Sequence, residues 1–309
     1  DRYHEHPFKP LIGESTSPLI LEGLLYVKTL GYMAAHPQDA AVTGVFHYYL
    51  LILGMCNKLL VQQTDAFGFE QFQKYTSNNF RELSEKTYRQ RFLQLSGNDM
   101  RNIRHIEGRF SPKGTLEDNV DIIKKITDGF DWLKHYREMV GIELPSMALV
   151  AHFIKKSDNN KGKVRFERLR KDLESKTDAL IALMNTKSTF SSMVTGVDAA
   201  ASEFDTPPEV FAPSFRRLRE HGMQHFTYHA GEDFFHVLSG LRAIYEAMEY
   251  LELQAGDRIG HATAAGVDVK LWKENVGERL WMRIEDYLND LVFAYHLIAI
   301  TKERALEPT

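Results

Sequence analysis

From about residue 100 onward, short apolar runs alternate with longer stretches in which apolar residues recur at helical spacing. Residues 147–154 form a nearly continuous apolar run, which is typical of a strand buried on both faces of a parallel sheet. Residues 116–140 instead place their apolar side chains on one face of a helix. The alternation continues to residue 261 and predicts βαβ units around a parallel sheet.

The predicted strands are separated by predicted helices along this part of the chain. The strands are 104–110, 147–154, 191–198, 224–229 and 258–261. The helices are 116–140, 163–184, 212–221, 237–253 and 281–300. A doubly wound sheet and a barrel both accommodate this order. We expect a (β/α)8 TIM-type barrel, because the chemically interesting residues follow the strand ends. This barrel is incomplete in the chain, since neither a first nor a last strand is evident.

The N-terminal third has a different hydrophobic pattern, because it lacks the short apolar runs that are typical of buried strands. We predict a mainly helical N-terminal portion or insertion over residues 1–100 and a β/α barrel portion over residues 101–309. Residues 40–57 carry no Asp, Glu, Lys or Arg, but they include His47 and are marginal in length for a bilayer. The stretch therefore predicts a buried helix, and we expect no membrane association.

Charge and composition narrow the function classes. The 38 basic and 42 acidic residues give a net charge of −4, so the basic excess that a phosphate backbone requires is missing, and nucleic acid is not an expected partner. A local pocket can still oppose the global charge and take a small anionic substrate. Cys56 is the single cysteine, which excludes an internal disulfide; we predict it to be buried. With no signal-peptide pattern, a cytoplasmic protein is expected.

The sharpest chemical signal is His229-Ala-Gly-Glu232, a histidine at a strand end followed by a turn and a carboxylate. A neutral imidazole at His229 can bind a metal, and a partly buried Glu232 can donate a proton. A second strand ends in His261, one strand–helix–strand repeat later. Because consecutive parallel strands are usually neighbours, these three side chains are expected to converge on the carboxyl rim of the sheet.

The preceding strand ends in Val194-Thr-Gly-Val-Asp-Ala-Ala-Ala-Ser-Glu203. Asp198 and the small residues 199–201 are expected beside His229, where they either contact a substrate or only permit close packing. Lys155 and Lys156 follow another strand, and we interpret them as a solvated basic surface.

These motifs, in this order, resemble those of the adenosine/AMP deaminase family. The resemblance covers about residues 104–265 and includes Gly108-Arg-Phe-Ser-Pro112, which is similar to the family's second barrel strand. The family is a zinc-dependent (β/α)8 barrel that hydrolyses the 6-amino group of adenine nucleosides or nucleotides. The resemblance implies that His229 is a zinc ligand, that Glu232 protonates the purine ring and that His261 orients the attacking hydroxide.

The same resemblance implies substrate contacts at Ala201 and Asp198. The family usually has glycine at the position of Ala201, where its backbone N–H meets the purine, and glycine at the position of Ala262. The family's other metal ligands come from a His-x-His on the first strand and an Asp on the last. His4-Glu-His6 has no strand in front of it, which disfavours it as that pair. We therefore expect the chain to be the middle of a longer polypeptide, with a degenerate barrel as the alternative.

The helical portion and the long 271–300 segment are more similar to large prokaryotic deaminases, such as the deaminase subunit of the RADAR anti-phage system. That similarity implies a homo-oligomer and a partner protein of a defence system. The sequence leaves two other functions open. One is another zinc hydrolase of the same barrel, and the other is a non-catalytic nucleoside-binding or scaffold subunit.

Overall fold

The computed structural model describes residues 18–61, 85–96, 101–158 and 164–306. The chain divides into two compact units. The first consists of residues 1–66 and 71–86, and the second of residues 67–70 and 87–309. The histidines of His4-Glu-His6 lie outside the described residues.

The described part of the first unit is a pair of helices, α2 (Pro18–Ala35) and α3 (Ala40–Val61). The carboxylate of Asp39 accepts hydrogen bonds from the first backbone N–H groups of α3 and caps it, which explains why the helix begins there. The predicted helix over residues 40–57 is confirmed, but the prediction of burial is wrong. Among the described residues of this unit, α2 is the helix that packs against α3, which buries Phe46 and leaves Val45 71% exposed.

Cys56 is also exposed, so its predicted burial is wrong for the same reason. None of the helices in the described ranges combines the length and the apolar character that crossing a bilayer requires.

The second unit is built on five parallel strands that neighbour one another in the order β1-β2-β3-β4-β5. The strands are β1 (His105–Phe110), β2 (Ser146–Ile154), β3 (Val194–Ala200), β4 (His225–Ala230) and β5 (Arg258–His261). Consecutive strands are therefore adjacent throughout. A doubly wound sheet would reverse direction at a switch point, and no reversal occurs among the described strands.

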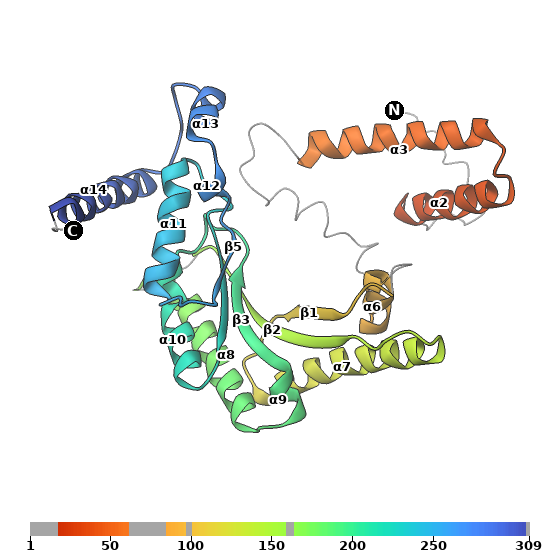
Figure 1. Ribbon diagram of the computed structural model, residues 1–309, viewed down its shortest axis with the longest axis horizontal. Coiled ribbons are helices and arrows are strands. Elements are labelled where there is room, and N and C mark those ends of the chain that lie inside the picture. The colour runs from red at the N-terminus through yellow and green to blue at the C-terminus, as the bar shows by residue number, and fades with distance from the viewer. Residues whose placement is uncertain (1–17, 62–84, 97–100, 159–163, 307–309) are drawn as a thin grey trace. The chain divides into compact units, whose positions relative to one another are not determined.

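Helices connect each strand to the next. They are α7 (Leu116–Met139), α8 (Glu167–Asn185), α9 (Thr189–Met193), α10 (Ala212–Glu220) and α11 (Val237–Tyr250), with the short 3₁₀ helix η2 (Pro208–Val210) before α10. The sheet is curved, and α7, α8 and α10 lie along its convex side (Figure 1). The second unit is thus a singly wound parallel sheet with helices outside, which is the arrangement of one part of a TIM-type barrel wall.

The described residues of the second unit include four more helices. These are α6 (Tyr88–Ser96), which packs on α7, and α12 (Thr263–Gly266), α13 (Val269–Val276) and α14 (Ile284–Leu306), which follow β5. The strand predicted over 191–198 begins later, at Val194. Its first residues instead form α9, because the Ser188 side chain accepts a hydrogen bond from the Ser191 backbone N–H and starts a helical turn.

Alternation along the strands separates two chemically different faces. The convex face is apolar and packs on the helices, as Phe153, Val197 and Phe226 show. The concave face carries charged and imidazole side chains, including those of Glu107 and Arg258. These two form an ion pair of 3.0 Å that joins β1 to β5, so the curvature brings side chains of the outermost described strands together. The sheet therefore has a polar interior.

Candidate functional site

Asp198 lies at the centre of the polar face of the sheet and is fully buried. One carboxylate oxygen accepts hydrogen bonds from Arg109 Nε at 2.8 Å and from His152 Nδ1 at 3.1 Å. The other accepts a hydrogen bond from His229 Nδ1 at 3.1 Å. An ionised carboxylate only accepts hydrogen bonds, so both imidazoles carry a proton on Nδ1. One buried anion thus fixes side chains from β1, β2 and β4.

These partners decide the charge state of Asp198. Burial alone raises the pKa of a carboxyl, but the hydrogen bonds from His152 and His229, together with the charge of His229 and the Arg109 hydrogen bond, hold the pKa of Asp198 well below its ordinary value. Asp198 is therefore a carboxylate under all ordinary conditions. Its oxygens are occupied by protein donors, so its direct action is on His229 and His152.

His229 is held on two sides. Its Nδ1 donates to Asp198, and its ring lies against the backbone of Gly260 on β5, where a Cβ atom would be 2.7 Å from the imidazole Cγ. Only glycine leaves room for the ring at this point of the neighbouring strand. With Nδ1 engaged, Nε2 is the nitrogen left for a metal or a substrate. A histidine whose other nitrogen is fixed by a carboxylate is the usual form of a metal ligand.

The turn after His229 is held by a carboxylate from the neighbouring strand end. Glu203 accepts hydrogen bonds from the backbone N–H groups of Gly231 and Glu232 at 2.7 and 2.8 Å. Gly231 has a φ of +74°, and a Cβ there would lie 2.6 Å from Ile244, so the position requires glycine for both reasons. Glu203 therefore fixes the backbone that carries Glu232.

The Glu232 side chain is 13% exposed and its Oε1 lies 3.4 Å from Nε2 of His261. Burial raises the pKa of Glu232, His261 opposes the shift, and the negative charge of Glu203 adds to it; the net direction is upward. A carboxyl group with a raised pKa can carry a proton nearer neutral pH. The rings of His261 and His229 are 5.2 Å apart, so the three side chains share one rim of the sheet.

Lys155, at the end of β2, reaches behind this turn. Its side chain is buried, and Nζ donates to the backbone carbonyl of His229 at 2.6 Å and lies 4.4 Å from the Tyr228 ring. Burial lowers the pKa of Lys155, and the carboxylates of Glu203 and Glu232 oppose that shift. The prediction that Lys155 belongs to a solvated surface is wrong, because its ammonium group serves as a hydrogen-bond donor inside the fold.

Three residues at the strand ends of the site have a positive φ. Ala201 has a φ of +91°, and His261 and Ala262 have φ values of +61° and +49°. Residues other than glycine rarely adopt such values, and they persist where the surrounding structure imposes them. The strain at Ala201 and Ala262 gives a physical reason for the glycine that the adenosine/AMP deaminase resemblance associates with both positions.

The structure thus brings together His229, Glu232, His261 and Asp198 from three strand ends, with Ala201 one residue past β3. Sequence reasoning missed His152. The signal was present, because His152 interrupts an otherwise apolar strand at a position in register with Asp198.

The orientation of His229 leaves its Nε2 for a metal or a substrate, but within the described ranges no group of three or more His, Cys, Asp or Glu side chains is arranged to hold an ion. Zinc in proteins usually requires three or four such ligands.

No protein-family model matches the chain. Among curated proteins, an adenosine deaminase from Clostridium kluyveri is 27% identical over 188 residues, which is 60% of this chain and 45% of that protein. The chain therefore spans less than half the length of the curated relative that it matches. This match supports the resemblance to adenosine deaminases drawn from the motifs, and the narrower similarity to the RADAR deaminase subunit stays a prediction.

Two solved structures are similar to the chain. One is an amidohydrolase from Burkholderia ambifaria with bound Zn, which is 22% identical with a TM-score of 0.39 over 61% of this chain and 44% of that chain. The other is an adenine deaminase from Arthrobacter aurescens, which is 16% identical with a TM-score of 0.38 over 67% of this chain and 55% of that chain. The fold described above rests on the strand order and register of this chain and not on these superpositions.

Proposed function

We propose that this chain carries part of the catalytic site of a metal-dependent hydrolase that removes the 6-amino group of an adenine nucleoside or nucleotide. The observation that carries the proposal is the fixed imidazole of His229, bound through Nδ1 to the buried Asp198 and placed at one rim with Glu232 and His261. The match to an adenosine deaminase supports the choice of substrate.

The reaction adds water to C6 of the purine, breaks the C6–N6 bond and releases ammonia. Zinc held by His229 would supply an activated water for this attack, since it would lower the pKa of that water toward about 7. His229 is the proposed ligand, and Asp198 fixes its tautomer and direction. We assign Asp198 this orienting role in place of the substrate contact expected from the motif, since its oxygens already accept hydrogen bonds from protein groups.

Glu232 is the proposed proton donor to the purine ring, which makes C6 more electrophilic. Its raised pKa supports this assignment. His261, whose Nε2 faces Glu232, orients the attacking water. The backbone N–H of Ala201 is the proposed contact to the purine. Among the described residues, His229 is the one that we propose as a metal ligand.

The experiment is a set of substitutions in the full-length protein loaded with zinc, assayed by the ultraviolet change as adenosine, AMP or ATP becomes its inosine counterpart. Glu232→Gln should lower turnover by about two to four orders of magnitude with little effect on substrate affinity. His261→Ala should lower turnover by at least about 100-fold and keep the metal. His229→Ala should lose the metal in elemental analysis. Glu249→Gln, on the exposed side of α11, is the matched control.

The two alternative functions give different results in the same assay. Another zinc hydrolase of this barrel would bind metal and lose it in His229→Ala, but it would convert no adenine compound. A nucleoside-binding or scaffold subunit would contain no metal and show no turnover. Near-normal turnover in Glu232→Gln would remove that residue from the mechanism. The anti-phage association, a homo-oligomer, a defence-system partner protein and cytoplasmic localisation stay predictions from the sequence.

A further inference from the structure

A cavity lies behind β4, on the face of the sheet opposite to His229. Tyr228 and His229 are neighbours on the strand and point to opposite faces. His229 contacts Asp198, whereas the Tyr228 ring packs edge-on against Phe211 and Phe215 of the helical layer. The cavity has a volume of about 530 Å³ and is lined by the loop 203–209, the end of β4, α11 and the start of α14.

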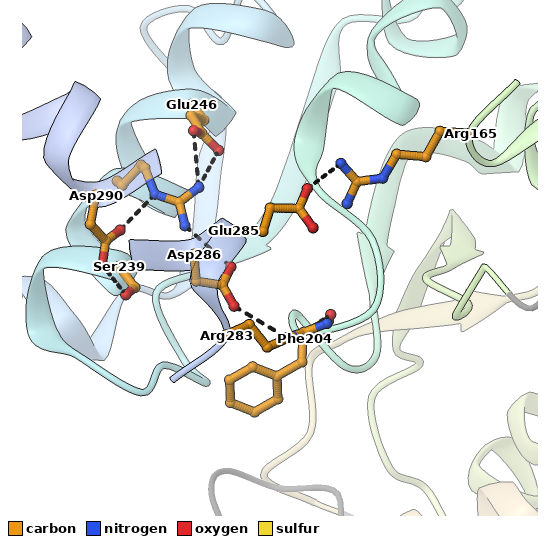
Figure 2. Close-up of polar contacts among 9 residues, drawn as sticks. Arg165, Phe204, Ser239, Glu246, Arg283, Glu285, Asp286 and Asp290 are labelled. Carbon is orange, nitrogen blue, oxygen red and sulfur yellow. Dashed lines mark hydrogen bonds and ion pairs between the residues drawn. The ribbon is translucent and has the colours of Figure 1, made fainter. Parts of the chain in front are cut away.

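Ion pairs hold the start of α14 at this cavity (Figure 2). Arg283 donates to the backbone carbonyl of Phe204 at 2.6 Å, and Arg165 pairs with Glu285. Arg242, on α11, forms ion pairs with Asp290 at 2.8 Å and with Glu246 at 3.1 Å. The arginines at the cavity are thus already engaged with carboxylates or carbonyls, and little of their positive charge remains for an anionic ligand.

Carboxylates exceed basic side chains in the lining, with seven of the former and four of the latter. Among the described residues no ion pair involves Glu209, which lies at the cavity. Burial raises the pKa of Glu209, and the charges of Arg165, Arg170 and Arg242 oppose that shift only in part. A positively charged ligand beside Glu209 would stabilise its ionised form.

The Tyr228 hydroxyl is a second observation in favour of a ligand, and it does not depend on the acidic lining. Tyr228 is 1% exposed, lines the cavity, and its hydroxyl has no hydrogen-bond partner among the described residues. Leaving a buried hydroxyl without a hydrogen-bond partner is unfavourable. A ligand with N–H groups satisfies it. The Tyr228 ring already has the Lys155 ammonium 4.4 Å from its centre. The cavity is also lined by four other aromatic rings, which offer apolar contact and faces that attract cations: Tyr250, Phe204, Phe234 and Phe235.

We propose that this cavity binds a small organic amine, whose ammonium group faces Glu209 and the Tyr228 hydroxyl and whose carbon chain lies against the aromatic rings. The three requirements are met together only by an organic cation. A metal ion would not use the aromatic lining, and an organic anion would meet the excess of carboxylates.

The experiment is calorimetric titration of the purified protein with 1,4-diaminobutane, and with 1,4-butanediol as the uncharged probe of equal length. The diamine should bind with a dissociation constant of about 1 mM or below, and the diol should bind at least about tenfold more weakly. Tyr228→Phe and Glu209→Gln should each weaken diamine binding by about fivefold or more. Glu249→Gln, on the exposed part of α11, should leave it unchanged.

Two outcomes would overturn the proposal. One is equal binding of diol and diamine, or no binding of either at about 10 mM. The other is unchanged diamine affinity in both Tyr228→Phe and Glu209→Gln, which would place the diamine elsewhere on this acidic protein. Tyr228→Phe removes one hydroxyl and keeps the ring, so it preserves the core and serves as the test if Glu209→Gln fails to fold.

Discussion

A Cβ atom added to Gly260 would lie 2.7 Å from Cγ of the His229 ring, so the backbone of β5 forms one wall of the slot that holds this imidazole. The opposite restraint is the hydrogen bond from His229 Nδ1 to Asp198. The position of the ring therefore depends on both neighbouring strands, β3 and β5, and not on the rotamer preference of His229 alone. A change at either wall should move the ring.

Gly260→Ala tests this slot. The added methyl group must displace the His229 ring or the strand, which costs about 1–3 kcal/mol in the free energy of unfolding. Urea unfolding measures that loss, and bound zinc per chain should fall with it. Gly266→Ala is the matched control, because no atom lies within 4 Å of a Cβ there and the residue is helical, so this variant should be neutral or slightly stabilising. Equal free energies of unfolding for the two variants would show that the His229 ring is not confined by the backbone of Gly260.

Glu203→Gln tests the support of the turn that carries Glu232. The carboxylate accepts two backbone N–H groups, from Gly231 and Glu232, and the amide of Gln retains one acceptor oxygen and loses the charge. We expect a loss of about 1.5–3 kcal/mol in the free energy of unfolding, measured by urea denaturation. Glu174→Gln, exposed on α8, is the control and should change stability by less than about 0.5 kcal/mol. A Glu203 variant as stable as this control would show that the turn holds without the carboxylate.

Ala201→Gly should stabilise the protein, which is unusual for a change to glycine. Ala201 has a φ of +91°, a strained value for any residue with a Cβ atom. Relief of that strain exceeds the entropic cost of glycine, and we expect a gain of about 0.5–1 kcal/mol in the free energy of unfolding. Ala199→Gly, on the regular part of β3, should lower it by about 1 kcal/mol, and thermal melting compares the two. A lower melting temperature for Ala201→Gly than for the natural chain would show that the positive φ of Ala201 does not strain the backbone.

Glu209→Gln should change the pH dependence of stability. Because burial raises the pKa of Glu209 in the folded state, the unfolded chain releases this proton at lower pH than the folded chain does. Stability attributable to the protonated carboxyl is complete below the unfolded pKa of about 4.3 and is lost as the pH rises through the folded pKa. Glu209→Gln should therefore be more stable than the natural chain at pH 8 and equally stable at pH 4, by urea unfolding. If the variant and the natural chain differed in stability by the same amount at pH 4 and pH 8, ionisation of Glu209 would not be the cause of the difference.

The sequence predicted the strand and helix order because the apolar periodicities of 2 and 3.6 residues are local properties of the chain. The approach of His229, Glu232 and His261 to one rim also followed from local information, namely a polar residue at the end of each buried strand. The curvature of the sheet and the singly wound order needed the structure, since the same strands also accommodate a doubly wound sheet.

The roles of His152, Lys155 and Asp198 depend on residues far away in the sequence, which explains why local patterns missed them. Lys155 follows a strand and precedes other lysines, a pattern typical of a solvated loop, yet its ammonium group meets the carbonyl of His229, 74 residues later. The fully buried Asp198 was expected to face a substrate, because the partners that occupy its oxygens come from three other strands.

The buried Asp198 has a consequence for how the second unit folds. Its three partners, Arg109, His152 and His229, are separated from it by 89, 46 and 31 residues. A carboxylate buried without these partners costs several kcal/mol, so we expect β3 to dock together with β1, β2 and β4. The four strands should therefore gain protection from hydrogen exchange in a single step. In Asp198→Asn, where the charge no longer enforces joint docking, the amides of β1 should exchange independently of those of β4.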